Sequence, residues 1–459
     1  MRRAMLTAAA AAMVMLAPAM ASAADEGDAH RGQPAPLAPD FELPAVQLRI
    51  QLGRALGEHA FLSIEAMRTG IAGGEEFEVA AELLEGNTVE VVEMVRLVYG
   101  DGAADAFAEL WRNHIGYLVD FTRAIAEGDS DAREIAASQL QAYADDFSAF
   151  LVEANPCLPR DAVTGLIQEH VQQLEQIASL ADEGFSDAYP AIRGTYAHMF
   201  MVGDGLGLGI LTRFGDRFPG RDTAFSPALD LRLTLDRLLG EHAYLAAIAM
   251  RARLTATDEL DAAVAALDDN SGELAAQVAK IYGADAGAAF DSLWRSHADL
   301  YLAYVDAVAE NDVDAEEAAL EGLRTYRSDF SSFLGDANPY LDAGDLEALL
   351  ATHTEHLVAQ VEAYEAEDFE AAYGTLREAY AHTESIAAGL AGAIADQFPQ
   401  QFPDTALGDV VPSAPPVGAA GWLLLLAGSA ATLLGRRGRG AGGARGCRRP
   451  RAVPATDRT

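Results

Sequence analysis

Histidines are the residues of this chain whose type and spacing best suit chemistry. There are 10 of them in 459 residues, and eight form four pairs separated by 183 or 184 positions. Neutral imidazole is a ligand for zinc, copper, iron and nickel, and it also serves as an axial ligand of haem iron. The four pairs are His59 and His242, His114 and His297, His170 and His353, and His198 and His382.

The pairing of the histidines reflects an internal repeat. The segment Leu48–Arg68 returns as Leu231–Arg251, with 13 of 21 residues identical. A repeat of this length has the size of a domain and exceeds that of a solenoid unit. We predict that copy 1 covers residues 46–219 and copy 2 residues 228–403, each with its own core and able to fold alone.

Both copies are predicted to consist of helices. Apolar side chains recur at spacings of three and four, and no alternating strand pattern lies between them. Glycine, asparagine and proline mark the breaks. The fold class is therefore all-α, with two tandem homologous bundles of about six helices each. The predicted helices are 46–70, 77–99, 103–127, 131–153, 160–182 and 186–213, then 229–254, 258–282, 286–309, 313–335, 343–365 and 370–397.

These helices decide whether the histidines can meet. Each paired histidine lies near the middle of a different helix and has apolar neighbours at three and four, so it should point into the core. Helix midpoints share one level in an up-and-down bundle, so four imidazoles can converge in each copy. Glu58, Glu241 and Glu169 precede histidines in sequence and could either supply a carboxylate oxygen to the metal or orient a histidine ring by a hydrogen bond.

Several readings of the histidines remain open. The first is a non-enzymatic protein that binds copper, zinc or iron, or a haem, in each four-histidine layer. The second is a structural or interaction module in which the histidines are hydrogen-bonded core residues. The third is a metal-dependent enzyme, although no catalytic residues stand out. A further pair with helical ligand spacing, His353 and His356, occurs only in copy 2.

The two ends of the chain predict export and anchoring. Residues 1–23 have the basic start, apolar stretch and small-residue cleavage site of a signal peptide. Residues 24–45 are polar and proline-rich, and we expect a disordered lead-in. A proline-rich linker, 404–416, precedes 417–435, which is uncharged and long enough to span a bilayer. The arginine-rich tail, 436–459, should lie in the cytoplasm, with both bundles outside.

The same end resembles a bacterial surface-sorting signal. Phe402–Ala406 reads as a degenerate form of the Leu-Pro-x-Thr-Gly motif that sortases cleave, followed by an apolar span and basic residues. Processing by a sortase-like enzyme is thus an alternative to a permanent membrane helix.

Charge excludes one class of partner. The chain has a formal net charge of −38, and Lys280 is its only lysine. Binding to nucleic acid requires neutralisation of phosphates by cationic side chains, so a nucleic-acid partner is excluded. We expect a monomer that contacts the membrane through its C-terminal helix. The sequence indicates no other protein partner.

Four short motifs return in both copies: Gly-Glu-His-Ala, Leu-Trp-Arg-x-His, Ala-Asn-Pro and Tyr-Ala-His. As a set they resemble a little-characterised family of secreted bacterial all-helical repeat proteins, some of which are labelled copper amine oxidase-like. The resemblance covers about 46–218 and 229–402. It implies a secreted helical protein with a signal peptide and a C-terminal anchor, and it assigns no activity to any residue.

Overall fold

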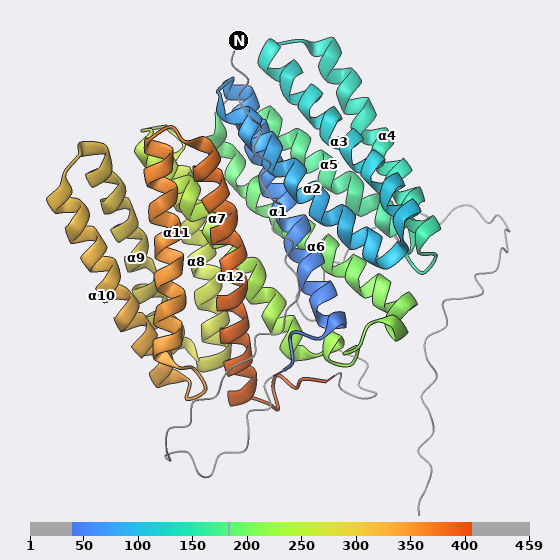
Figure 1. Cartoon of the computed structure of the whole chain (residues 1–459). Helices are drawn as coiled ribbons and strands as arrows, with labels where there is room; N and C mark the ends of the chain where they lie inside the picture. Colours follow the sequence, from blue (N-terminus) through green and yellow to red (C-terminus); the bar gives the residue numbers. More distant parts are fainter. Residues whose placement is uncertain (1–38, 182–183, 406–459) are drawn as a thin grey trace, which may run out of the picture. The chain divides into compact units, whose positions relative to one another are not determined.

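The computed structural model describes residues 39–181 and 184–405, and these contain helices and no strand. Figure 1 shows the helices of each copy packed alongside one another as a bundle. Copy 1 contains α1 (Pro44–Ala72), α2 (Glu76–Tyr99), α3 (Asp101–Glu127), α4 (Ser130–Ala154), α5 (Arg160–Ala181) and α6 (Tyr189–Phe214). Copy 2 contains α7 (Pro227–Leu254), α8 (Leu260–Tyr282), α9 (Ala284–Glu310), α10 (Val313–Ala337), α11 (Ala343–Glu365) and α12 (Phe369–Gln397). The all-α prediction is confirmed.

Local sequence explains where these helices begin and end. Gly73 and Gly128 follow α1 and α3 in the left-handed conformation, with φ of 71° and 67°, which glycine adopts without strain. Asp129 caps α4 by accepting hydrogen bonds from two backbone N–H groups. Helix α1 begins at Pro44 and so includes the end of the expected lead-in, because proline suits the first turn of a helix.

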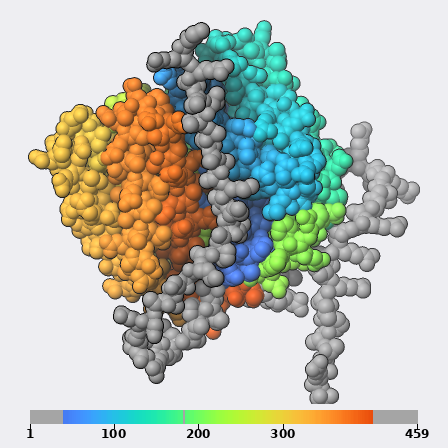
Figure 2. All heavy atoms as spheres, in the orientation of Figure 1, coloured from blue at the N-terminus to red at the C-terminus, as the bar shows by residue number. Residues whose placement is uncertain are grey.

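Helices α1 and α7 are the central helices of their copies. Helix α1 packs against α2, α3, α5 and α6, and α7 packs against α8, α9, α11 and α12. Both are therefore buried around most of their circumference, including polar residues such as Ser63 and Asp236. Figure 2 shows one face of the molecule with all heavy atoms drawn, and side chains cover the helices on this face. This placement puts His59 and His242, one on each central helix, deep in the protein.

Close approach of α6 to α1 depends on glycine. A Cβ atom added at Gly203 would lie 2.1 Å from the carbonyl oxygen of Leu52, and one added at Gly207 would lie 3.2 Å from the Cα atom of Arg49. The glycines of α6 therefore let two helix backbones touch.

The expectation that each copy has its own internal core holds only in part, because two clusters of buried apolar residues belong to copy 1 alone and a third joins the two copies. One continuous cluster of buried apolar residues contains members of both copies. Phe61 of α1 stacks on Tyr244 of α7, with ring centroids 4.4 Å apart and planes inclined by 20°. Helix α2 also packs against α12, and α6 against α8. Periodicity within one copy identifies buried faces but not their partners, because an apolar stripe packs equally well against another copy.

Several predicted segments lie outside the described residues. These are the signal peptide at 1–23, the lead-in up to residue 38, and the linker from 406 with the predicted span at 417–435 and the tail at 436–459. Among the helices that the structure describes, none combines the length and the apolar character that membrane crossing requires.

Candidate metal centre

Three of the four predicted histidines meet in copy 1. His59 lies on α1, His114 on α3 and His170 on α5, and all three are buried. The Nε2 atoms of His59 and His114 are 3.2 Å apart. The ring centroid of His59 lies 5.2 Å from that of His114 and 5.9 Å from that of His170. His59, on the central helix, thus bridges the other two.

Copy 2 repeats this arrangement. The Nε2 atoms of His242 on α7 and His297 on α9 are 3.4 Å apart. The ring centroid of His242 lies 5.4 Å from that of His297 and 6.0 Å from that of His353 on α11. We call these two groups the histidine triads, His59/His114/His170 and His242/His297/His353.

Aromatic side chains pack against the histidine rings of each triad. In copy 1, Trp111 lies one turn before His114 on α3, and its ring centroid is 4.6 Å from that of His59. Tyr143 of α4 stacks on His114 with a centroid separation of 4.6 Å and an interplanar angle of 17°. Trp294 and Tyr326 take the same places in copy 2. These rings pack directly against the imidazole rings and restrict their orientation.

The triad histidines are neutral at physiological pH. Burial disfavours the charged imidazolium and lowers the pKa of His114 to about 3, of His297 to about 4 and of His353 to about 3. Burial and the neighbouring imidazoles hold the pKa of the other triad members, His59, His170 and His242, well below the usual range. A neutral imidazole keeps the lone pair that a metal ion requires.

Hydrogen bonds orient part of each triad. The Nδ1–H of His297 donates to the carbonyl oxygen of Trp294. Because a carbonyl only accepts, Nδ1 carries the proton and Nε2, which faces His242, keeps its lone pair. In copy 1, neither ring nitrogen of the buried His170 has a hydrogen-bond partner among the described residues. A buried polar group of this kind calls for a partner.

The fourth predicted histidine of each copy has a different partner. The Nε2–H of His198 donates to the carbonyl oxygen of Leu166 at 2.9 Å, and that of His382 donates to Leu349 at 2.8 Å. The Nδ1 atom of His198 lies 3.9 Å from a carboxylate oxygen of Glu169. The predicted four-histidine layer is thus three histidines in contact and one bonded to the backbone. The sequence shows that a side chain faces inward but not which partner it reaches.

The carboxylates of Glu58 and Glu241 are held by contacts other than the histidine rings. Glu58 accepts hydrogen bonds from Asn87 at 2.9 Å and from Arg377 of copy 2 at 2.9 and 3.0 Å. Successive residues of a helix point about 100° apart, so Glu58 turns towards the other copy while His59 faces its own bundle. Glu241 accepts equivalent bonds from Asn270 and Arg193. Contrary to the prediction, Glu58 and Glu241 therefore do not orient the histidine rings but form part of the contact between the two copies.

These asparagines and arginines were not predicted as functional residues. Their signal was available, because Asn87, Asn270, Arg193 and Arg377 occupy matched positions in the two copies. His356, the unpaired histidine, lies 3.7 Å from Glu378, and its ring centroid is 5.7 Å from that of His382. The spacing of His356 from His353 suggested that both could bind one ion. In the structure, His356 instead lies beside Glu378 and His382.

Two further findings bear on the site. Among residues 39–181 and 184–405, no group of three or more histidine, cysteine, aspartate or glutamate side chains is close enough as placed to hold a metal ion. Comparison with known protein families, with curated proteins and with solved structures gives no match. The chemistry of the site rests on its own geometry.

Proposed function

We propose that this is an exported, membrane-anchored protein in which each histidine triad binds one transition-metal ion. The observation that carries the proposal is the facing pair of Nε2 atoms in each copy, 3.2 Å apart in one and 3.4 Å in the other. Two nitrogens bound to one tetrahedral ion at the usual bond length of 2.0–2.1 Å would be about 3.3 Å apart. Ring centroids around such an ion would be separated by about 5 Å, close to the 5.2 and 5.4 Å found here.

The third ligand in copy 1 would be His170. Its ring is within 5.9 Å of His59, and both of its nitrogens lack a partner among the described residues. Binding would require the side chain of His170 to reorient, because no three ligand side chains of the described residues are close enough as placed to hold an ion. Three imidazoles leave a fourth position for a small ligand, as in catalytic zinc sites.

The surroundings favour a metal ion alone over haem. Trp111 and Tyr143 pack directly on the rings of the first triad, with centroid separations near 4.6 Å. A porphyrin would have to displace them. Imidazole suits copper, zinc, iron and nickel, and copper binds most tightly among the divalent ions. Storage or scavenging of copper or zinc outside the cell follows, and the acidic surface would concentrate cations near the protein.

Elemental analysis of the purified full chain tests the proposal. We expect about two metal equivalents per chain after equilibration with Cu²⁺ or Zn²⁺ and removal of the excess. His59→Ala should remove one equivalent and His242→Ala the other, while helix content by circular dichroism stays unchanged. The matched controls are His198→Ala and His382→Ala, which remove imidazoles bonded to the backbone and should leave the stoichiometry at two.

Tryptophan fluorescence reads each site separately. The chain has three tryptophans, and Trp111 and Trp294 each pack against one triad. In Trp294→Phe, Cu²⁺ should quench Trp111 with saturable dependence on one equivalent, and quenching should vanish on adding His59→Ala. Wild-type protein that binds no metal would overturn the proposal and leave the histidines as a hydrogen-bonded pair in a structural or interaction module.

A further inference from the structure

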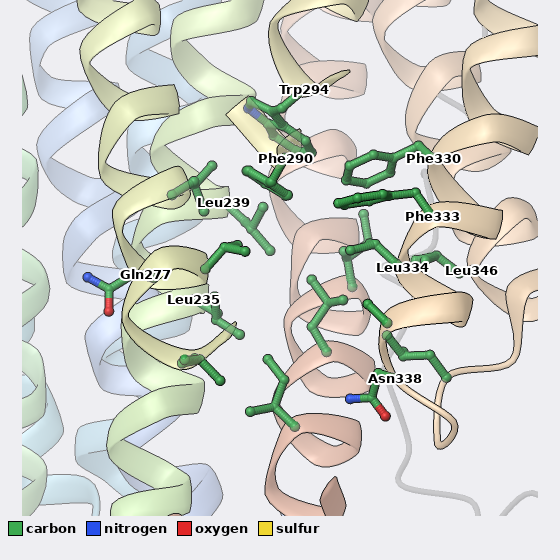
Figure 3. A pocket seen from close by; sticks show the side chains of 18 of the residues that line it. Leu235, Leu239, Gln277, Phe290, Trp294, Phe330, Phe333, Leu334, Asn338 and Leu346 are labelled. Atoms are coloured by element: carbon green, nitrogen blue, oxygen red, sulfur yellow. The ribbon is translucent and has the colours of Figure 1, made fainter. Parts of the chain in front are cut away.

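Copy 2 contains an apolar cavity of about 100 Å³. Side chains from α7 to α12 line it, with Trp294 and Asn338 towards its opposite ends (Figure 3). Well-packed protein interiors contain few voids larger than a water molecule. A cavity of the same order, roughly 150 Å³ in an engineered protein, stays dry and binds benzene. The void in copy 2 is thus large enough to hold part of an organic molecule.

The lining of the cavity selects an uncharged apolar ligand. Phe290, Phe330 and Leu334 contribute hydrocarbon surface, and no lysine or arginine belongs to the lining. The polar groups at one end satisfy one another, because Asn338 donates to the hydroxyl of Tyr282 at 3.1 Å and that hydroxyl donates to Gln397 at 2.8 Å. An anionic head group would find no cation there, and the chain as a whole is acidic.

The cavity is elongated. Its lining on α12 extends from Thr383 to Ile394, which corresponds to about 16 Å along the helix axis. On α8 the lining extends over Leu274 to Tyr282. A long, narrow, apolar space fits a hydrocarbon chain better than a compact ring system.

The inner part of the cavity reaches the second triad. His242 and His353 belong to its lining, together with Trp294. A chain that fills the cavity would therefore end beside two imidazole rings. At the position of Thr383, copy 1 has Met199, which is buried and belongs to the apolar cluster around the first triad. The longer methionine fills space that threonine leaves free.

We infer that copy 2 binds an uncharged, elongated hydrocarbon chain in this cavity, with one end against His242 and His353. The inference stands on the cavity alone and needs no metal ion. Burial of each methylene group strengthens binding by about fourfold, so a chain of several carbons can bind measurably without a polar anchor. Metal binding by the triads and chain binding by the cavity are separate properties.

Isothermal calorimetry with 1-octanol tests the inference, on the full chain freed of metal with a chelator. We expect saturable binding of one molecule per chain, with a negative heat-capacity change from burial of apolar surface. Octanoate, which has the same chain length and a charge, should bind at least about tenfold more weakly. Absence of saturable octanol binding by the wild-type protein would overturn the inference, whatever the result of the metal analysis.

Two variants locate the bound chain. Thr383→Met introduces the residue that copy 1 has at this position, and Leu346→Phe narrows the cavity from α11. Each should weaken octanol binding by about tenfold or more. The control is Thr375→Met, which adds the same side chain to α12 at a position that does not line the cavity. If both cavity variants keep their helix content and bind octanol as tightly as the control, the chain binds elsewhere and the inference is wrong.

Discussion

Arg377 and Glu58 lie 319 residues apart in the chain, yet their side chains form a bidentate ion pair with N–O distances of 2.9 and 3.0 Å. Arg193 and Glu241 form the same pair in the opposite sense, from copy 1 to copy 2. Reciprocal contacts of this kind define an isologous interface. The carboxylate of Glu58 adjoins His59 in sequence, so the contact between copies helps to fix the central helix that carries a triad histidine.

Removing one arginine of this interface should destabilise the protein strongly. In Arg377→Ala, the buried carboxylate of Glu58 keeps only its bond to Asn87, and breaking a buried pair from one side costs about 2–4 kcal/mol. Urea denaturation would measure the loss. The control is Arg324→Ala, which breaks the exposed pair with Glu321 and should cost less than about 0.5 kcal/mol. Equal losses in the two variants would contradict a structural role for the reciprocal pairs.

Each copy expressed alone should self-associate. An isolated copy 1, residues 40–219, would expose Phe61, Glu58 and Arg193 on a face that is buried in the full chain. Because the interface is isologous, Glu58 of one molecule can meet Arg193 of another, as Glu241 does here. Sedimentation equilibrium should show a dimer. A stable monomer with the helix content of the full chain would contradict the shared core.

The metal-free protein should lose stability as the pH falls below about 6.5. The triad histidines have a lower pKa in the folded protein than in the unfolded chain, where it is about 6.5. The unfolded chain therefore takes up protons first, and stability continues to fall until the pH reaches the folded-state pKa of about 3 to 4 of His114, His297 and His353. Each histidine contributes about 1.4 kcal/mol per pH unit in this window.

A carboxylate marks a separate acid transition. Burial alone would raise the pKa of Glu65, but Arg251 and Arg68 outweigh it and hold the pKa at about 2. Its contribution is present above the unfolded pKa near 4 and is lost only as the pH falls towards 2. Urea midpoints at pH 7.5, 6.5 and 5.5 lie above this transition and in the range in which histidines of the unfolded chain take up protons. In His114→Gln, the urea midpoint should fall less steeply as the pH is lowered, because one titrating group has been removed. A pH dependence equal to that of the wild-type protein would rule out titration of the triad.

Replacing glycine by alanine should have opposite effects on the stability of the protein at two positions, Gly203 and Gly389. Gly203→Ala places a methyl group against the backbone of Leu52 and should destabilise the protein by about 1–3 kcal/mol. Gly389, on the matching helix of copy 2, has no atom within 4 Å of an added Cβ. Gly389→Ala should stabilise the protein by about 0.5–1 kcal/mol through helix propensity. Thermal melts would compare the two, and a stabilised Gly203→Ala protein would mean that α1 and α6 do not touch at this position.

Fractionation of cells tests the predicted anchor, which lies outside the described residues. The full-length protein should remain with the membrane, and a version that ends at Pro416 should be released, because residues 417–435 supply the apolar span. If the two forms distribute alike and neither is linked to the cell wall, the anchor assignment is wrong.

Local patterns predicted the helices well, because their ends are set by nearby residues such as Gly128 and Asp129. The meeting of His59, His114 and His170 also followed from the sequence, since apolar stripes and helix midpoints place them at one level. The partner of His198 did not, because the sequence shows that this ring faces inward but not that the carbonyl oxygen of Leu166 lies within hydrogen-bond distance. The partner of Glu58 lies on the other copy, where no spacing along the chain identifies it.

The reciprocal contacts also affect how the protein responds to dilution. A symmetric dimer of separate chains dissociates when its concentration falls, whereas two copies in one chain meet at a fixed, high effective concentration. Joining them also lets the two sides of the contact differ. Glu65 of copy 1 binds Arg251, while copy 2 has Ile248 at the matching position. One copy can then acquire a property that the other lacks. Copy 1 has the larger side chain of Met199 where copy 2 has Thr383 beside the cavity.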